Sequence, residues 1–297
     1  MSARPAGSPS GAELATRFAP SPTGPLHLGH AYSAILAHDM AREAGGTFLL
    51  RIEDIDRDRS RPEWEAQIYD DLRWLGLSWP EPVMRQSDRQ PAYDAALDRL
   101  WAMGLLYPCT CNRRDILAAA SAPQEGAPMT GPDGIVYPGT CRPDAAPSGP
   151  RPRDVALRLD MARAAALTGP VGFTETGAGP DGETGDITVT PDTLTATIGD
   201  AVLARRGWGT AYHLAVVVDD AAQGITLVTR GHDLYEATPL HVLIARLLDL
   251  PVPAYHHHRL IRDETGKRLA KRDDARAIAK YRAEGARPAD IRRMVGL

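Results

Sequence analysis

The sequence has few lysines and few cysteines, only three of each in 297 residues, and it has no long hydrophobic run. The longest apolar stretches, such as 214–218 and 240–244, are far shorter than the ~18–20 residues that a membrane-spanning helix needs. The N-terminus lacks the apolar core of a secretory signal, so we expect a cytoplasmic protein with no membrane contact. An odd number of cysteines argues against a disulfide framework and leaves metal ligation or free thiols.

Charge is unevenly distributed along the chain, although 43% hydrophobic and 24% charged residues are typical of a globular protein of about two domains. The net charge is -4, but residues 258–297 hold 12 Lys and Arg against 6 Asp and Glu, a local +6 that leaves -10 for the rest. All three lysines, Lys267, Lys271 and Lys280, lie in this segment, whereas the chain has 31 arginines. Either a compact ammonium is needed there, or the lysines fall by chance on a solvated surface.

The N-terminal part predicts a strand, turn, helix, strand unit. After a loose tail over 1–14, residues 17–19 indicate a short strand that enters the turn 20–25. A helix is expected over 29–44, ended by Gly45 and Gly46, and a buried strand over 47–55. This order is typical of nucleotide-binding α/β folds.

Further along, Ser60 to Glu63 has the pattern of a capping box before an amphipathic helix, and a second helix is expected from Pro91 to Gly104. Segments rich in Ala, Pro and Gly over 118–152 and 177–185 predict an irregular insertion, a small second domain. The β-branched runs 212–218 and 225–229 predict central strands, followed by a helix capped by Thr238 and Pro239.

The predicted fold is therefore a doubly wound parallel α/β domain of Rossmann type, split by an insertion. We expect a tail over 1–14, the main domain over 15–105 and 195–255, the insertion over 106–194, and a basic C-terminal segment over 256–297.

The segment Pro25-Leu26-His27-Leu28-Gly29-His30 lies where the first strand turns into the first helix. Unpaired N–H groups at a helix N-terminus bind anions, and Gly29 lets a ligand approach the backbone closely. His27 and His30 can donate hydrogen bonds to phosphate oxygens during attack on a nucleotide α-phosphate. The alternative is that both histidines simply begin a helix.

A second candidate is the basic segment Arg268-Leu269-Ala270-Lys271-Arg272, which follows Thr265 and Gly266 and has no apolar periodicity. A loop of this kind can close over a triphosphate and stabilise charge on the leaving pyrophosphate, or it can be a solvated surface. Together, H-x-G-H near the start and this loop near the end resemble the HIGH and KMSKS signatures of class I aminoacyl-tRNA synthetases.

Other blocks narrow the resemblance to glutamyl-tRNA synthetases: RFAPSPTG at 17–24, RIEDID at 51–56, and the stretches 212–220 and 229–234. The match runs from Arg17 to about Arg272. Only 25 residues follow Arg272, so we expect the helical anticodon-binding domain to be absent. A shortened chain of this pattern resembles the paralogues that esterify glutamate onto the queuosine base of tRNA(Asp).

The resemblance implies roles for individual residues. His27, His30 and Lys271 are expected to be catalytic, and ATP is expected to contact His27, Gly29, His30, Arg268 and Lys271. A separate set of residues is expected to bind glutamate: Arg17, Phe18, Ala19, Pro20, Ser21, Glu53, Tyr212 and Arg230. Arg17 or Arg230 would bind a carboxylate and Glu53 the substrate ammonium, although a simple internal pair between Glu53 and arginine is the alternative. The usual K-L-S-K-R is R-L-A-K-R here, which removes one possible hydroxyl contact to phosphate.

Cys109-x-Cys111 and Tyr137-x-x-x-Cys141 match the C-x-C, Y-x-x-x-C zinc motif of those paralogues. The resemblance implies one structural Zn²⁺ per chain, bound by three thiolates and a phenolate oxygen in a tetrahedron. The loop between the two ligand pairs is longer than usual, and this departure from the motif affects the assignment of Tyr137 as a ligand more than that of the cysteines. Three reduced thiols without metal are the alternative.

The expected reaction has two steps, with ATP and Mg²⁺. Glutamate attacks the α-phosphate to give glutamyl-adenylate, and a hydroxyl of queuosine on tRNA(Asp) then takes the glutamyl group. We expect a monomer. Three rivals remain: a short synthetase that charges a tRNA 3′ end, an H-x-G-H nucleotidyltransferase for a small metabolite, and a non-catalytic RNA-binding paralogue.

Overall fold

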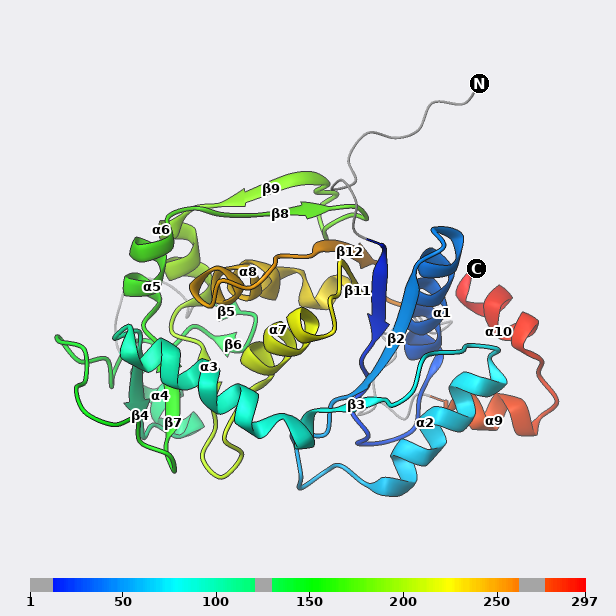
Figure 1. The fold of residues 1–297 in the computed structure, drawn as a ribbon, viewed down its shortest axis with the longest axis horizontal. Coiled ribbons are helices and arrows are strands. Elements are labelled where there is room, and N and C mark those ends of the chain that lie inside the picture. The colour runs from blue at the N-terminus through cyan, green and yellow to red at the C-terminus, as the bar shows by residue number, and fades with distance from the viewer. Residues whose placement is uncertain (1–12, 121–129, 262–275) are drawn as a thin grey trace.

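A computed structural model describes residues 13–120, 130–261 and 276–297 of the chain. Its centre is a parallel sheet in two hydrogen-bonded parts (Figure 1). In one part, β1 (Ala15–Phe18) pairs with β2 (Thr47–Ile52), which pairs with β3 (Met84–Arg85), all in parallel. In the other, β11 (Leu227–Gly231) pairs in parallel with β12 (Ala254–His258), and β12 with β8 (Val171–Glu175).

The two parts meet between β1 and β11. The Thr226 N–H, just before β11, donates to the Ala15 carbonyl at 3.0 Å, so both strands start side by side. Strands β2 and β3 lie on one side of this junction, and β12 and β8 lie on the other. The strand order therefore reverses between β1 and β11, and the crevice beyond their carboxyl ends is where open α/β sheets bind ligands.

Two helices of the first half follow the sequence prediction closely. Helix α1 (Leu28–Glu43) packs on β1 and β2, and Gly45 follows it with a φ of 67°, a conformation that suits glycine. Helix α2 (Pro62–Trp74) also forms, but the predicted capping box does not. Arg61 is the N-cap residue without a side-chain bond, and the Ser60 hydroxyl is buried without a hydrogen-bond partner. The helix therefore begins one residue later than the capping-box pattern predicts.

The prediction of a strand over 212–218 was wrong, because these residues begin helix α7 (Tyr212–Ala222). Leu214, Ala215, Val216 and Val217 are all buried, so this part of the helix is apolar all round and shows no helical period. A short apolar run of this kind cannot be assigned to helix or strand from periodicity alone. The second of the two predicted strands is confirmed as β11.

Helix α8 (Thr238–Leu247) also forms where expected, but Thr238 is its first residue and not its cap. Helices α3 (Gln90–Ala102) and α5 (Met161–Thr168) surround the same large core as α7 and α8. Short 3-10 turns η1 (Gln86–Arg89) and η3 (His232–Ala237) lead into α3 and α8. At the C-terminus, α9 (Ile278–Ala283) and α10 (Pro288–Val295) bury Ile278 and Ile291 in the core around α1 and α2.

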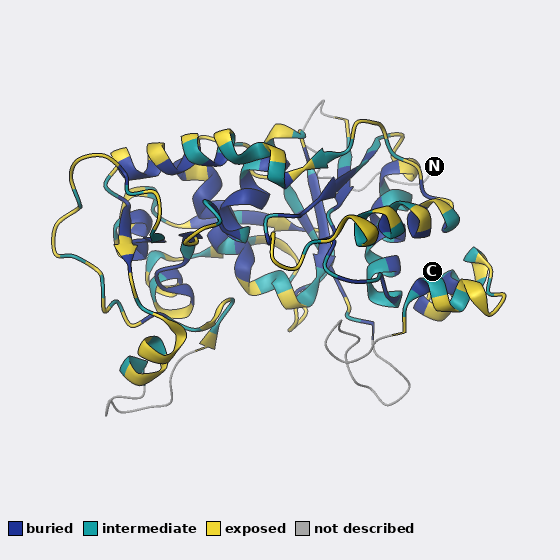
Figure 2. Cartoon of the chain, turned by 90° about the horizontal axis from the view of Figure 1, so that it is seen from below, coloured by how far each residue is buried: buried dark blue, intermediate teal, exposed yellow. Residues whose placement is uncertain are grey.

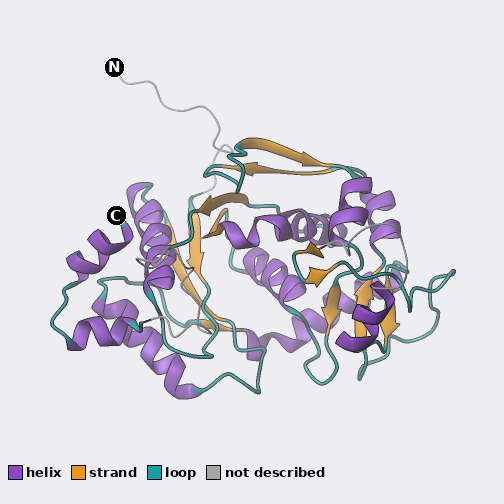
Figure 3. Ribbon diagram, turned by 180° about the vertical axis from the view of Figure 1, so that it is seen from behind, coloured by secondary structure: helices purple, strands orange, loops and turns teal. Residues whose placement is uncertain are grey.

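The expected insertion contributes β4 (Leu106–Cys109) and β7 (Ala156–Leu159) to an antiparallel sheet, whose third strand, β10 (Val202–Ala204), lies beyond the expected boundary at residue 194. It also holds α4 (Arg113–Ala120), the hairpin of β5 (Thr130–Gly131) and β6 (Gly134–Ile135), and α6 (Pro191–Thr193) with the π-turn η2 (Leu194–Ile198). Figure 3 shows these small strands on the side of the molecule away from the C-terminus. Strand β9 (Gly185–Val189) pairs with β8, which joins β12 of the main sheet, so hydrogen bonding is continuous between the two regions.

Burial is greatest in the middle of the molecule, where strands and helices are largely dark blue in Figure 2, and most residues of α8 are buried. Several charged residues share this buried zone, among them Arg17, Arg51, Glu53, Asp219 and Asp220. Buried charges need partners, so their arrangement defines the site described next. In the described part of the chain no helix combines the length and apolarity needed to cross a bilayer.

Candidate active site

A cavity of about 380 Å³ opens at the carboxyl ends of β1 and β11. Its walls come from β1, the start of α1, the end of β2, the start of α7, the end of β11 and the segment after β12. Nine residues expected from the sequence line it: Arg17, Phe18, Ala19, His27, Gly29, His30, Glu53, Tyr212 and Arg230. The fold thus brings most of the predicted site residues together at the reversal of strand order.

Ser21 and Pro20 occupy different places. Ser21 lines a neighbouring cavity of about 180 Å³ that shares Glu53 and Tyr212 with the first. Pro20 is buried, and its carbonyl accepts a hydrogen bond from the Glu53 N–H at 3.0 Å, so its backbone holds Glu53 in place. Arg268 and Lys271 lie outside the described residues.

The two histidines of H-x-G-H are stacked at the start of α1, with ring centroids 3.7 Å apart. The Gly29 N–H donates to His27 Nδ1, and the His27 N–H donates to His30 Nδ1, each at 3.1 Å. Because Nδ1 accepts in both rings, a neutral ring of either residue carries its proton on Nε2. Both imidazoles can therefore donate a hydrogen bond from Nε2, and phosphate oxygens accept such bonds.

Glycine at position 29 leaves room for the His27 ring. A Cβ atom there would lie 3.0 Å from His27 Cε1 and 3.1 Å from His27 Nδ1, tighter than ordinary contacts. A larger residue would therefore displace the His27 ring by a few tenths of an ångström. Gly29 therefore serves the arrangement of the imidazoles as well as the approach of a ligand.

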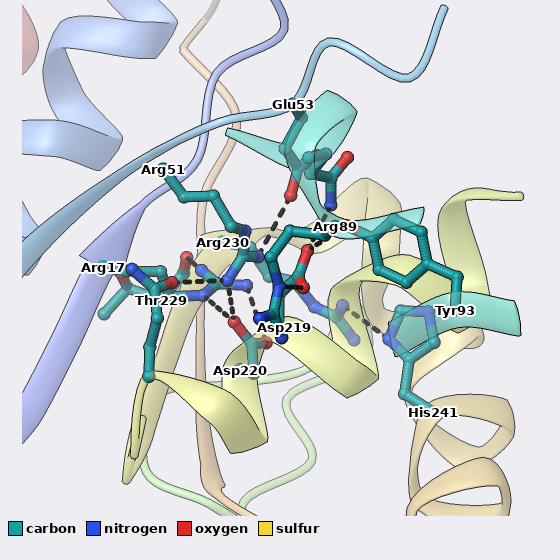
Figure 4. Close-up of polar contacts among 12 residues, drawn as sticks. Arg17, Arg51, Glu53, Arg89, Tyr93, Asp219, Asp220, Thr229, Arg230 and His241 are labelled. Carbon is teal, nitrogen blue, oxygen red and sulfur yellow. Dashed lines mark hydrogen bonds and ion pairs between the residues drawn. The ribbon is translucent and has the colours of Figure 1, made fainter. Parts of the chain in front are cut away.

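Arg17 and Arg51 converge on Asp220 (Figure 4). Arg17 Nε lies 3.0 Å and Arg51 Nη1 lies 2.7 Å from Asp220 Oδ1, and Arg51 Nη2 lies 3.1 Å from Glu53 Oε1. Burial disfavours ionisation of Asp220, but both guanidinium groups outweigh it, and the pKa of this carboxyl falls below its usual value. Asp220 is consequently the anion that compensates Arg17 and Arg51.

Glu53 has the opposite balance. It is 7% exposed, and burial raises the pKa of its carboxyl despite the positive charges of Arg51 and Arg17. An ammonium group bound in the cavity would favour the ionised form of Glu53. The internal pair with Arg51 exists, as the alternative interpretation held, but it involves a carboxylate that also lines the cavity.

Arg230 is bound quite differently from Arg17. It is 6% exposed, and its Nε, Nη1 and Nη2 groups donate to His257 Nε2 at 3.0 Å, His241 Nδ1 at 3.0 Å and Thr238 Oγ1 at 2.7 Å. Burial lowers the pKa of His257 and, strongly, that of His241, so both rings are neutral acceptors. Within the described residues no carboxylate forms an ion pair with Arg230, and its charge remains for a ligand.

Sequence reasoning missed Arg51, Asp220 and the ring of partners around Arg230. Arg51 has a sequence signal, because it lies near the end of the buried strand β2, two residues before Glu53. His257 and His241 have no such signal, since they come from β12 and α8 and meet only in the fold. Nine further residues line the cavity to which the sequence analysis gave no role: Thr229, Gly231, Asp233 and Leu234 from the block 229–234, and Ser33, His258, Arg259, Leu260 and Ile261.

A second cluster lies in the insertion, where the sulfur atoms of Cys109, Cys111 and Cys141 are within 4.8 Å of one another. The Tyr137 hydroxyl lies 3.5 Å from Cys109 Sγ and 3.4 Å from Cys111 Sγ. Arg158 donates to Cys109 Sγ at 3.2 Å and stacks 3.8 Å over the Tyr137 ring. Hydrogen bonds from Tyr137 and the other thiols outweigh burial and lower the pKa of Cys141 to about 6. All three cysteines are free, and this donor set fits a soft metal such as Zn²⁺.

Comparison with known proteins agrees with this geometry. Residues 13–129 and 175–297 match the family described as tRNA synthetases class I (E and Q), catalytic domain. The chain is 66% identical, over 96% of its length and all of the relative, to a protein of Rhodobacter capsulatus named glutamyl-Q tRNA(Asp) synthetase. It is 44% identical to a Symbiobacterium thermophilum protein of the same name, over 94% of this chain and 84% of that one.

Among solved structures, a glutamate tRNA ligase from Elizabethkingia meningosepticum in complex with its amino acid matches with a TM-score of 0.74 and 26% identity. A glutamate-tRNA synthetase from Elizabethkingia anophelis matches with a TM-score of 0.75. Each match covers 96% of this chain, which spans 61% of either ligase.

The chain therefore belongs to the class I tRNA synthetases of the glutamate and glutamine group, with their parallel α/β catalytic domain. Within that class it is a member of the glutamyl-Q tRNA(Asp) synthetases. The resemblance inferred from the sequence blocks is confirmed.

Proposed function

We propose that the enzyme activates glutamate with ATP in the 380 Å³ cavity and transfers it to the queuosine base of tRNA(Asp). The charge of the site is the observation that supports glutamate activation. Arg17, Arg230 and Arg259 line the cavity with Glu53 and Asp233, and the buried Arg51 and Asp220 add one charge of each sign, which leaves one positive charge when all seven are ionised. Glutamate, with two carboxylates and one ammonium, brings one negative charge. Glutamine is neutral overall and would leave the buried positive charge uncompensated.

Each group of the substrate has a partner of suitable chemistry. Arg230 keeps an uncompensated guanidinium for a carboxylate, and Glu53 offers an oxygen to the ammonium. The Tyr212 hydroxyl stays protonated, because burial raises its pKa, and can donate a hydrogen bond. Arg17 lies at the end of β1 with Asp220 fixing its fork, so it is a preformed contact.

In activation, the glutamate α-carboxylate attacks the α-phosphorus in line, the bond to the β-phosphate oxygen breaks, and pyrophosphate leaves. His27 and His30 are positioned to donate from Nε2 to phosphate oxygens at the start of α1. Lys271 is expected to stabilise the charge that grows on pyrophosphate. Mg²⁺ is expected to accompany ATP.

The acceptor is tested by following labelled glutamate. With ATP and tRNA(Asp) that bears or lacks queuosine, we expect label only on the modified tRNA, and we expect it to survive periodate oxidation of the 3′ end. ATP–pyrophosphate exchange should run with glutamate alone, since both substrates are expected within one domain. Label on the 3′ end of unmodified tRNA(Glu) would assign the enzyme to ordinary charging, and exchange without any RNA product would point to a different acceptor.

We also propose that the insertion over 106–194 binds one structural Zn²⁺ through Cys109, Cys111, Cys141 and Tyr137. The positive Arg158, which donates to Cys109 Sγ and lies over the Tyr137 ring, favours an anionic donor set. The metal would hold together a region in which these cysteines and Tyr137 form only a small core with Tyr107.

For the metal, elemental analysis of the purified protein should give one zinc per chain. Because the chain has only three cysteines, a thiol reagent should modify none quickly before chelation and three afterwards. Tyr137→Phe should keep three sulfur ligands and lose zinc faster to a chelator. A metal-free protein whose three thiols react at once would show that these are free thiols. Full zinc retention in Tyr137→Phe would exclude the phenolate as a ligand.

A further inference from the structure

Arg230 is the end of a chain of hydrogen bonds that crosses from the catalytic cavity into the insertion. Its Nη1 group donates to His241 Nδ1 at 3.0 Å, and His241 Nε2 lies 2.9 Å from His213 Nδ1. His213 Nε2 lies 3.0 Å from Asp133 Oδ1, in the turn between β5 and β6. Four elements distant in the sequence therefore meet: β11, α8, α7 and the β5–β6 hairpin.

Arg230 fixes the donor and the acceptor of every hydrogen bond in this series. A guanidinium only donates, so His241 Nδ1 must accept and the neutral ring carries its proton on Nε2. That N–H donates to His213 Nδ1, which leaves the His213 proton on Nε2 to be donated to the Asp133 carboxylate. Each imidazole is thereby held in one tautomer, as a carboxylate holds the histidine of a metal or catalytic site.

Both histidines are buried, so each depends on its hydrogen-bond partners within the protein. His241 is 2% and His213 is 5% exposed, so water cannot easily replace a missing partner. The rings also pack with Tyr212, whose centroid lies 5.3 Å from that of His213 and 5.7 Å from that of His241. Without a carboxylate at the far end, His213 could turn or change tautomer, and His241 would lose the acceptor that orients it toward Arg230.

We propose that Asp133, His213 and His241 form a hydrogen-bonded relay that positions Arg230 for a carboxylate of the amino acid substrate. The relay rests on the proposed glutamate activation. None of its three residues lines the 380 Å³ cavity, so they are positioning residues that act through Arg230. The relay makes glutamate binding depend on the insertion, because Asp133 lies between Cys111 and Tyr137 in the chain.

The test uses Asp133 because its side chain is 56% exposed and its removal should leave the fold intact. In ATP–pyrophosphate exchange, Asp133→Ala should raise the KM for glutamate about three- to tenfold, the effect of losing one hydrogen bond. The KM for ATP and kcat should stay within about twofold, since only the amino acid contact is displaced. Asp133→Asn should restore most of the affinity, because its amide oxygen still accepts from His213.

Asp192→Ala is the matched control, since this exposed carboxylate of α6 lies outside the relay. His213→Ala should weaken glutamate binding, and adding Asp133→Ala to it should cost less than about twofold more, because both changes break one relay. Thermal unfolding checks that each variant folds. If His213→Ala does not fold, the comparison of Asp133→Ala with Asp133→Asn still tests the relay.

An unchanged KM for glutamate in Asp133→Ala would overturn the relay, as would an equal rise in the KM for ATP or fully additive effects in the double variant. The wild-type enzyme separates this failure from a wrong function. If it shows no glutamate-dependent exchange, the proposed activation is wrong. If it exchanges normally while Asp133→Ala matches it, only the relay is wrong.

Discussion

Arg230→Leu is expected to lower kcat/KM for glutamate by about a hundredfold to a thousandfold, equivalent to roughly 3–4 kcal/mol. The change removes a cavity arginine that forms no ion pair within the described residues, and it leaves His241 and His257 as buried acceptors without their donor. The substrate carboxylate would then enter a buried site without its counter-charge. Exchange kinetics with glutamate and with glutamine measure the effect and should show a collapsed preference for glutamate.

Arg246→Leu is the control, because this exposed arginine of α8 donates, among the described residues, only to the Pro170 carbonyl. Arg230→Lys should recover a minor part of the activity, since one ammonium cannot reproduce three separately directed donors. Should Arg230→Leu keep the wild-type preference for glutamate over glutamine, another group must recognise the carboxylate, and Arg17 would be the next candidate.

The second large effect is expected at Lys271. Lys271→Ala should lower kcat about a hundredfold to a thousandfold while changing the KM for ATP far less, because the charge that this ammonium meets grows only as pyrophosphate leaves. Lys271→Arg should not fully restore the rate, since a flat guanidinium does not replace a compact ammonium. Pre-steady-state adenylate formation measures the step directly.

Lys267→Ala provides the comparison within the same basic segment, outside the R-L-A-K-R pentapeptide. It should behave as a surface charge, with little change in the rate of adenylate formation. Equal losses at positions 267 and 271 would mean that the segment acts as a general basic patch and has no specific catalytic lysine.

The sequence by itself determined the family and half of the cavity lining. The blocks RFAPSPTG, H-x-G-H and RIEDID are each continuous, so residues that must meet a ligand together are also neighbours in the chain. Glycine and Pro punctuation and clear helical periods likewise gave α1, α2 and α3, because those signals depend on local backbone preference.

The tertiary structure decided what local preference could not. Residues 212–218 are mostly apolar and include three valines, yet they form a helix, since burial on every side of residues 214–217 removes the period that distinguishes helix from strand. The partners of Arg17 and Arg230 depend on Asp220, His241 and His257, which come from α7, α8 and β12 and meet only when the strands are ordered. Which arginine is compensated and which keeps its charge is a property of that packing, because electrostatic partners are set by distance in space and not by spacing along the chain.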